Sequence, residues 1–361
     1  MRIVFISSLL PSGHFSEILC SSLQKYTDLD ITIYSVWRNG PWYVVDILKQ
    51  LKKDKPDIVH IQQELNMYGG GVTILLFPIL LLIMRLMKIR VITTIHAAVY
   101  KKEIDERFIT LFLMKKPWYI KPSILKIFFH LLFSSVSRFS DSVVCHSNMM
   151  KDILTKDYGV QEKKIHMIRT IIPKHTLSKQ KKGMYFLYFG YIVRRKGLEK
   201  LIDGFAKFHK KHPDFKLVLA GGTIRGQEKA KDEIASYVQS KQLDAHVVFT
   251  GFVDEDHISE LYKKAYAVVI PAYLSMGSSG PLYHAQSYGK CILASDVGHF
   301  KEDIQHEVNG LLVNNDSWDA ALTRVVKNTK LVASIEQGVS QRMKEKSPKI
   351  IAKQYEKLYN S

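Results

Sequence analysis

Short apolar segments recur along the whole chain and are separated by longer stretches with helical periodicity. Most of these segments are continuous apolar runs without polar alternation, which is the pattern of strands buried on both faces of a parallel sheet. Strands that alternate with helices predict βαβ units with right-handed crossovers. We therefore predict an α/β fold, with strands at 2–7, 30–36, 57–62, 90–95, 142–146 and 165–168, and again at 184–190, 216–220, 246–250, 267–271, 291–295 and 310–313.

A polar, basic segment without apolar periodicity separates the two sets of strands. It runs from Pro173 to Gly183 and is predicted to be an interdomain linker. The 361 residues exceed one ordinary core and suit two domains. We expect one domain at 1–173, a second at 184–345 and a helix at 346–361, where apolar residues recur at helical spacing.

The composition limits the class of protein and its partners. The chain has 46% hydrophobic and 24% charged residues, which is typical of a folded globular protein. Its formal net charge of +18 favours an anionic partner such as a phosphate group, an anionic lipid or a nucleic acid. No recognised nucleic-acid-binding module is present, so we expect no nucleic-acid partner. Three widely spaced cysteines indicate free thiols in a reducing compartment, with neither a disulfide framework nor a zinc site.

One apolar stretch, 72–87, is about as long as the shortest membrane spans, but Pro78 and Arg85 interrupt it. We interpret it as a buried helix between two parallel strands. Met1-Arg2 leads directly into a strand-like run, so no signal peptide is expected.

A strand, a basic loop and a helix follow one another at 184–205. The predicted strand ends at Gly190, Lys196-Gly197 lies at the strand-to-helix turn, and an amphipathic helix begins near Leu198. A lysine at such a turn can reach a phosphate bound near the helix N-terminus, where free N–H groups and the helix dipole also favour anions. A solvated basic loop would have the same composition, so this segment alone leaves both interpretations open.

A Gly/Ser-rich turn, GSSG at 277–280, precedes another predicted helix that begins with Pro281. Serine suits the N-cap and proline the first helical turn. Small residues let a diphosphate approach the backbone closely. We expect N–H donors from Ser279, Gly280 and Leu282, because Pro281 has no N–H group. An ordinary capped helix would have the same sequence pattern.

Together with GFV at 251–253 and ASDVG at 294–298, these two segments resemble the retaining glycosyltransferases of the family-4 type, which have the GT-B fold. The resemblance is strongest at 184–313 and looser in the first half of the chain. It implies two Rossmann-like domains with a cleft between them and a C-terminal helix crossing back onto the first domain. It also implies that the second domain holds a nucleotide sugar and the first domain holds the acceptor.

The resemblance assigns expected roles to individual residues. Lys196 would contact the donor diphosphate, with help from Arg194 or Arg195. His96 would lie near the transferred sugar, although a histidine at a strand end can also be a core residue. Gly13 is expected where a first-domain loop approaches the diphosphate. The remaining donor-binding positions are expected to be Gly190, Gly277, Ser278, Ser279, Gly280, Leu282 and His284.

Two positions depart from the family pattern. The family usually has two glutamates eight residues apart around the Gly-rich turn, where this chain has Met276 and His284. A neutral His284 can hydrogen-bond to a ribose, whereas Met276 cannot replace a carboxylate. Either other groups orient the donor or the activity has been lost. We expect the former, because Lys196 and the turn remain and leaving-group electrostatics are usually the largest contribution to catalysis.

Polar residues that directly follow first-domain strands are the acceptor-side candidates, because ligands gather at the carboxyl ends of strands in open α/β sheets. They are His14, Glu17, Gln62 and Glu64, which could equally belong to surface loops.

Segment 107–138 interleaves large apolar residues with Lys115, Lys116, Lys121 and Lys126. This pattern is typical of an interfacial membrane-binding region, although core residues with a solvated lysine face would produce it too. We expect a cytoplasmic protein that binds peripherally to an anionic membrane surface.

We therefore expect a hexosyltransferase that takes a sugar from a UDP- or GDP-sugar and passes it to a lipid-linked or polysaccharide acceptor, without a metal or other cofactor. A sugar-nucleotide epimerase of the same fold is an alternative that would need acidic groups in the cleft. A non-catalytic glycan- or nucleotide-binding subunit of the same fold is a second alternative. A third alternative, a nucleic-acid-binding protein, is supported by the net charge alone.

Overall fold

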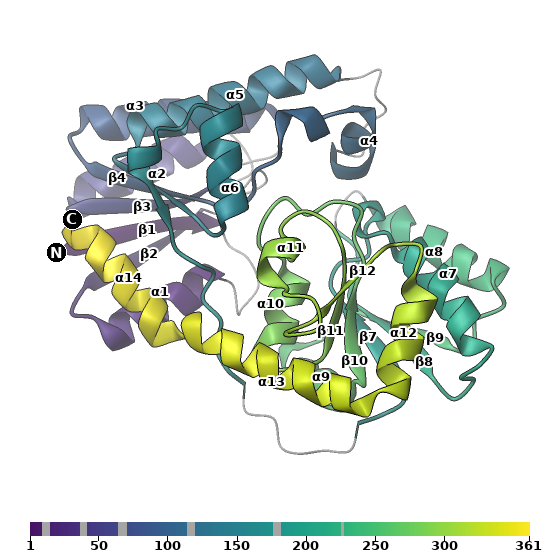
Figure 1. Cartoon of the computed structure of the whole chain (residues 1–361). Coiled ribbons are helices and arrows are strands. Elements are labelled where there is room, and N and C mark those ends of the chain that lie inside the picture. Colours follow the sequence, from purple (N-terminus) through teal and green to yellow (C-terminus); the bar gives the residue numbers. More distant parts are fainter. Residues whose placement is uncertain (9–14, 37–41, 64–70, 114–119, 176–181, 225–226) are drawn as a thin grey trace. The chain divides into compact units, whose positions relative to one another are not determined.

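The chain forms two compact units, Met1–Ile171 with Lys346–Ser361, and Ile172–Glu345. Each unit is built on a parallel six-stranded sheet (Figure 1). All twelve predicted strands are present, and each of their ends lies within one residue of its predicted position. The predicted α/β fold class is therefore confirmed. The computed structural model describes residues 1–8, 15–36, 42–63, 71–113, 120–175, 182–224 and 227–361.

The sheet of the first unit has the strand order β2-β1-β3-β4-β5-β6. Its strands are β1 (Arg2–Ser8), β2 (Asp30–Val36), β3 (Ile58–Gln63), β4 (Arg90–Ile95), β5 (Ser142–Cys145) and β6 (Ile165–Met167). Every residue of β3 and β5 is buried, which explains why these segments lack polar alternation.

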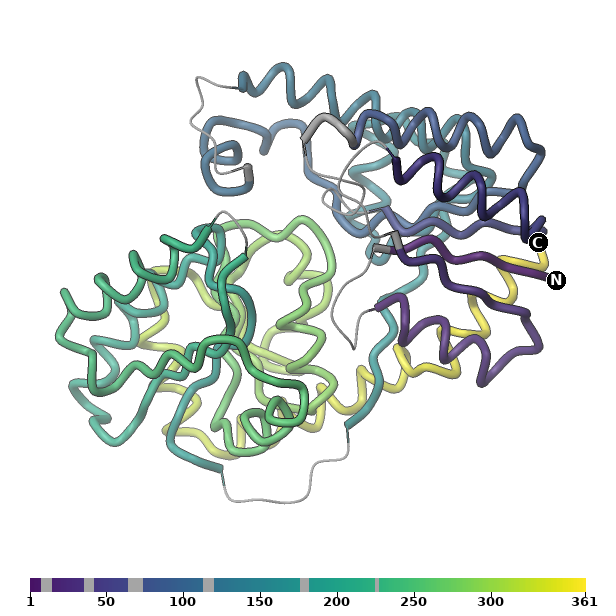
Figure 2. The backbone as a smooth tube through the Cα atoms, turned by 180° about the vertical axis from the view of Figure 1, so that it is seen from behind, coloured from purple at the N-terminus to yellow at the C-terminus, as the bar shows by residue number. Residues whose placement is uncertain are grey.

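Helices cover both faces of this sheet (Figures 1 and 2). One face carries α1 (Phe15–Tyr26) and α14 (Pro348–Asn360), which pack on each other. The other carries α2 (Trp42–Asp54), α3 (Phe77–Leu86) and α5 (Pro122–Phe139), with α3 beside α5. Shorter helical segments of this unit are η1 (Gly71–Leu76), η2 (Lys101–Glu103), α4 (Glu106–Phe108), η3 (Ile109–Leu113), α6 (Asn148–Asp152), η4 (Ile153–Asp157) and η5 (Glu162–Lys164).

The C-terminal helix α14 is part of the core of the first unit. Tyr355 and Tyr359 are buried against β1 and α1. The Tyr359 hydroxyl lies 2.7 Å from Nδ1 of His60 in β3. The Arg90 guanidinium donates to the backbone oxygens of Tyr359 and Leu358 at 2.6 and 2.9 Å. Because these carbonyls at the helix end have no partner within the helix, the cation satisfies them and also complements the helix dipole. The expected return of this helix to the first domain is confirmed.

The apolar stretch at 72–87 forms η1 and α3 and is buried on one face only. Phe77, Leu80, Leu81 and Met84 face the core, whereas Leu75, Ile79, Leu82 and Leu86 are exposed. The predicted helix between two parallel strands is present, but only one of its faces is buried. Within the described ranges, no helix has both the length and the hydropathy that a membrane crossing requires.

The sheet of the second unit has the strand order β12-β11-β10-β7-β8-β9. Its strands are β7 (Tyr185–Phe189), β8 (Lys216–Ala220), β9 (Val247–Gly251), β10 (Ala267–Ile270), β11 (Ile292–Ser295) and β12 (Leu311–Val313). The strand order reverses between β7 and β10, which are neighbours in the sheet. Such a topological switch point is where doubly wound sheets bind ligands, outside the carboxyl ends of the strands.

The loops after β7 and β10 lead into the two helices of this unit that bear on the site. The amphipathic helix predicted to begin near Leu198 is α7 (Leu198–His209), and the helix predicted after the Gly/Ser-rich turn is α10 (Gly280–Ser287). The other helices are η6 (Arg194–Lys196), α8 (Glu228–Ser240), α9 (Glu255–Lys264), α11 (Phe300–Asp303), α12 (Trp318–Lys327) and α13 (Thr329–Glu345).

Candidate functional site

The loop after β7 and the start of α10 are in close contact at the switch point of the second unit. A Cβ atom at Gly190 would lie 2.9 Å from Cγ of Pro281, and Gly190 has φ of +147°. Both the space and the backbone conformation therefore require glycine here. The loop is fixed to the neighbouring strand by backbone hydrogen bonds from Gly190 to Ala220 and from Ile192 to Gly222, each 2.9 Å. The predicted positions Gly190 and Gly280 thus lie at the same edge of the sheet.

The basic turn η6 follows this loop and ends at Gly197, which has φ of +61° and forms the N-cap of α7. Burial, and to a smaller extent the neighbouring Arg195 charge, lowers the pKa of Lys196 to about 8. A nearby negative charge would stabilise the ammonium group in this setting, so the turn is suited to receive an anion.

The structure distinguishes the two arginines of the turn. The Arg194 guanidinium binds the Glu233 carboxylate of α8, with Nε 2.9 Å from Oε2. Arg194 would have to leave this ion pair to reach a phosphate.

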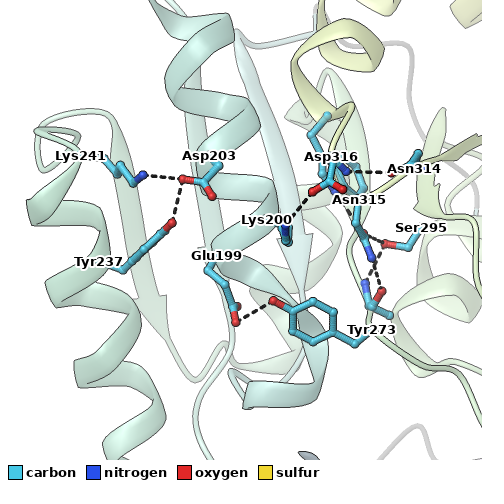
Figure 3. A network of polar contacts seen from close by, with 12 residues as sticks. Glu199, Lys200, Asp203, Tyr237, Lys241, Tyr273, Ser295, Asn314, Asn315 and Asp316 are labelled. Carbon is cyan, nitrogen blue, oxygen red and sulfur yellow. Dashed lines mark hydrogen bonds and ion pairs between the residues drawn. The ribbon is translucent and has the colours of Figure 1, made fainter. Parts of the chain in front are cut away.

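Tyr273, which the sequence reasoning missed, connects the two loops of the site (Figure 3). Its N–H donates to the backbone oxygen of Arg195 at 3.1 Å, and its hydroxyl donates to Glu199 of α7 at 3.0 Å. Its ring lies against Gly197, where a Cβ atom would be 3.5 Å from three ring carbons. A tyrosine three residues after a strand carries no sequence signal for this role, because the contacts are made by a distant turn.

A second set of hydrogen bonds fixes the segment before Tyr273 (Figure 3). The Ser295 hydroxyl accepts from the Ala272 N–H at 2.9 Å and donates to the Asn315 side chain at 2.6 Å. The Asn315 amide in turn donates to the Ala272 carbonyl at 3.0 Å. The loop after β10 is therefore held by the ends of β11 and β12 on one side and by the basic turn on the other.

The Gly/Ser-rich turn caps α10 as predicted. Ser279 is the N-cap residue, and its hydroxyl accepts from the Leu282 N–H at 3.5 Å. Leu282 was expected to offer that N–H to a ligand, and this expectation is not supported, because the capping serine already uses it. The N–H groups proposed from Ser279 and Gly280 lie at the helix start, where the dipole favours an anion.

His284 lies on the first turns of α10 among aromatic rings. Its ring centroid is 5.2 Å from that of Phe189 and 5.4 Å from that of Tyr283. Burial, and to a smaller extent His175, lowers the pKa of His284 to about 4, so the imidazole is neutral at pH 7. Met276, the other departure from the family pattern, is buried and offers no polar group.

The first unit brings Gln62 and His96 together at the carboxyl edge of its sheet. His96 Nε2 lies 2.7 Å from Gln62 Oε1, and Phe15 packs edge-on against the His96 ring with centroids 5.0 Å apart. Glu17 lies exposed in the first turn of α1. Gln63, which follows Gln62 in the same predicted acceptor-side run, is buried, and its side-chain amide has no hydrogen-bond partner among the described residues. Gly13, His14 and Glu64 lie outside the described residues.

Among the described residues, no three His, Cys, Asp or Glu side chains lie close enough together to hold a metal ion.

Two family models match the chain. Residues 9–174 match the model described as Glycosyltransferase Family 4, and residues 170–342 match Glycosyl transferases group 1. Together the two matches extend over most of the sequence.

Curated relatives are similar to parts of this chain. Mannosylfructose-phosphate synthase of Agrobacterium fabrum is 27% identical over 202 residues, which are 47% of this chain and 44% of the relative. The O-antigen chain mannosyltransferase RfbU of Salmonella typhimurium is 27% identical over 216 residues, which are 58% of each chain. The chain thus spans about half the length of the curated relatives it matches.

Solved structures show the same fold at low sequence identity. Anabaena HepE in complex with UDP-glucose has a TM-score of 0.76 at 14% identity, with 100% of both chains covered. Sucrose-phosphate synthase from Thermosynechococcus elongatus has a TM-score of 0.76 at 16% identity, with 100% of this chain and 98% of the other covered.

Proposed function

This chain belongs to the family-4-type glycosyltransferases of the GT-B fold, and from that premise we propose that it is a retaining hexosyltransferase. Its donor is a UDP- or GDP-sugar, and its acceptor is a lipid-linked or polysaccharide glycan. HepE was crystallised with UDP-glucose, and RfbU is named an O-antigen chain mannosyltransferase, which supports these donor and acceptor classes.

One observation carries the proposal: the basic turn and the start of α10 lie at the same switch point. The contact between Gly190 and Pro281 joins the loop after β7 to α10. The hydrogen bond from Tyr273 to Arg195 joins the loop after β10 to the basic turn. A diphosphate at this edge would meet Lys196, Arg195 and the N–H groups near Ser279 together.

The chemistry proposed for these groups is stabilisation of the leaving diphosphate. The bond between the anomeric carbon and the phosphate oxygen breaks, and the acceptor oxygen forms a new bond to the same carbon. The acceptor hydroxyl proton goes to the leaving phosphate. Lys196 and Arg195 neutralise the charge that develops on the diphosphate, which is worth more in a partly buried site than in water.

The first unit is proposed to present the acceptor. His96 would lie near the transferred sugar, with its ring orientation fixed by Gln62 and Phe15. Gln63 adds a buried amide that has no partner among the described residues, and such a group is stabilised when a ligand or water hydrogen-bonds to it. Glu17 and the undescribed Gly13, His14 and Glu64 remain proposals from the sequence.

We also propose that the enzyme works on the inner face of an anionic membrane, as a lipid-linked acceptor would require. The net charge of +18 supports attraction to anionic headgroups.

The proposal is tested by measuring thermal stabilisation with a panel of nucleoside diphosphates and nucleotide sugars, followed by transfer assays with the donor that stabilises most. Lys196→Ala should reduce transfer roughly 100-fold or more. Because the pKa of Lys196 is about 8 in the free protein, nucleotide affinity should fall as the pH rises from 8 to 10 and the ammonium is lost.

Lys196→Arg is the matched control, since a guanidinium keeps its charge over this pH range. Its nucleotide affinity should change little between pH 8 and 10. Unchanged transfer by a folded Lys196→Ala protein would remove Lys196 from the mechanism. Tight nucleotide binding without transfer to any acceptor would favour the non-catalytic subunit, for which the replacement of both family glutamates is the supporting observation.

A further inference from the structure

Seven large aliphatic side chains are exposed on two neighbouring helices of the first unit and on the short helical segment that leads into the first of them. Seventeen large hydrophobic residues are exposed in the described part of the chain, so these segments hold a large share of them. Exposed apolar residues are ordinary when they are scattered singly, whereas a concentration of them marks an interaction surface. The seven are Leu75, Ile79, Leu82 and Leu86 in η1 and α3, and Ile124, Ile127 and Leu131 in α5.

The exposed residues form a stripe along each helix. In both helices they recur every three or four residues, on the side opposite the residues that face the core. Leu86, for example, is 72% exposed, whereas Met84 is fully buried. The helices α3 and α5 lie side by side in the outer layer of the unit (Figures 1 and 2). The two stripes therefore make one surface, which we call the α3–α5 face.

The charges of the α3–α5 face have one sign. Neither α3 nor α5 contains an aspartate or a glutamate. Lys121 is the N-cap residue of α5, and Arg138 is exposed in its last turn, whereas Lys126 is half-buried on another side of the helix from Ile124 and Ile127. Arg85 of α3 is paired with Asp141 at 3.3 Å and contributes less. A surface with aliphatic stripes and cations is complementary to an anionic lipid headgroup layer over acyl chains.

The composition of the stripes also distinguishes lipid from a protein partner. All seven exposed residues are leucine or isoleucine. Protein interfaces derive most of their affinity from tryptophan, tyrosine and arginine, and leucine is under-represented among their strongest contacts. Acyl chains need no hydrogen bonds and no shape-specific pocket, so plain aliphatic stripes satisfy them.

We propose that the α3–α5 face is the surface by which this chain lies on an anionic lipid bilayer. Its aliphatic stripes enter the boundary between headgroups and acyl chains, and Lys121 and Arg138 meet the lipid phosphates. The inference rests on the proposed membrane association but not on the proposed chemistry.

The α3–α5 face is not the segment predicted from the sequence. Of 107–138, only the α5 part contributes to it. Phe108 is buried and stacks on Phe112 with ring centroids 4.8 Å apart. Lys115, Lys116 and Trp118 lie outside the described residues. The exposed stripe on α3 belongs to the apolar stretch 72–87, which was predicted from the sequence to be a buried helix.

The test is co-sedimentation of the full chain with phosphatidylcholine vesicles, with and without phosphatidylglycerol. Wild type should bind the vesicles that contain phosphatidylglycerol. The double variant Ile79→Glu/Ile127→Glu should bind them roughly 10-fold more weakly or worse, because each new carboxylate lies on the proposed contact surface. Ile350→Glu is the matched control, since Ile350 is an exposed isoleucine on α14 of the same unit, and it should bind as wild type does.

Thermal stabilisation by nucleotide shows that each variant is folded, and it reports on the donor site separately. If the double variant binds vesicles as tightly as wild type, the α3–α5 face is wrong while membrane association stands. If wild type binds neither kind of vesicle, the proposed membrane association and the proposed role of the α3–α5 face are both wrong. The proposed donor chemistry is unaffected by that result. If wild type is a dimer that the double variant dissociates without any change in vesicle binding, the face is covered by a second copy and the inference is overturned.

Discussion

At the scale of single residues, His284 is the position where this chain departs most informatively from its family. The imidazole lies among aromatic rings at the start of α10, and burial keeps it neutral at physiological pH. A carboxylate in the same place would be costly to desolvate unless it were hydrogen-bonded to the ligand. A neutral histidine can donate or accept one hydrogen bond without that cost.

We predict that His284→Ala weakens nucleotide binding by about 1–2 kcal/mol, the free energy of one hydrogen bond in a partly buried site. His284→Gln, which keeps a neutral hydrogen-bonding group, should recover most of the loss. Isothermal titration calorimetry with the nucleoside diphosphate that stabilises the protein most measures the affinity of both variants. Equal affinities in wild type and the alanine variant would show that His284 is an aromatic packing residue without contact to the ligand.

At the scale of elements, Tyr273 couples the loop after β10 to the turn before α7. Its ring packs on Gly197, and its backbone N–H and hydroxyl hold Arg195 and Glu199. Because the turn carries the proposed phosphate-binding lysine, displacement of the turn should matter more for turnover than for folding.

Tyr273→Ala should lower kcat/KM roughly 10-fold by releasing the basic turn. Tyr273→Phe keeps the ring on Gly197 and loses only the hydroxyl bond to Glu199, so it should retain most of the activity. The melting temperature of each variant, measured alongside, separates positioning from stability. A phenylalanine variant as poor as the alanine variant would assign the effect to the hydroxyl and not to the ring.

The elements themselves were predictable from the sequence because both sheets are parallel and buried. Their strands are uniform apolar runs, and each strand was located to within one residue. The capped start of α10 was also predictable, since serine and proline act locally there. The ion pair of Arg194 could not be predicted in this way, because its partner Glu233 lies 39 residues away in the sequence. Tyr273 and the exposed stripe of α3 were missed for the same reason, since each is defined by its tertiary neighbours.

At the scale of the whole molecule, a buried histidine connects the first sheet to the C-terminal helix. His60 is fully buried, with Nδ1 at 2.7 Å from the Tyr359 hydroxyl and Nε2 at 2.7 Å from Thr94 Oγ1. Burial, and to a smaller extent His146, lowers the pKa of His60 from 6.5 to about 3. The unfolded chain therefore takes up a proton at a pH where the folded chain does not.

The contribution of His60 to the free energy of unfolding is fully present above pH 6.5 and is lost as the pH falls toward 3. Acidification from pH 7 to pH 5 should destabilise the first unit by about 2 kcal/mol through this residue. Urea unfolding at the two pH values measures the change. His60→Gln should be less sensitive to acid by that amount, even if it is less stable at pH 7. An identical pH dependence in the variant would exclude His60 as the cause.

The place of α14 in the first unit also has a consequence for biosynthesis. The ribosome completes residues 1–171 long before it adds Tyr355 and Tyr359, which belong to the same core. Until then, the faces of β1 and α1 that α14 covers are open, and Arg90 has no carbonyls of α14 to bind. The second unit, by contrast, is one uninterrupted stretch, 172–345, and is complete when its own last helix emerges. The nascent chain therefore completes its second unit before its first. The first unit remains incomplete until residues 346–361 have been synthesised.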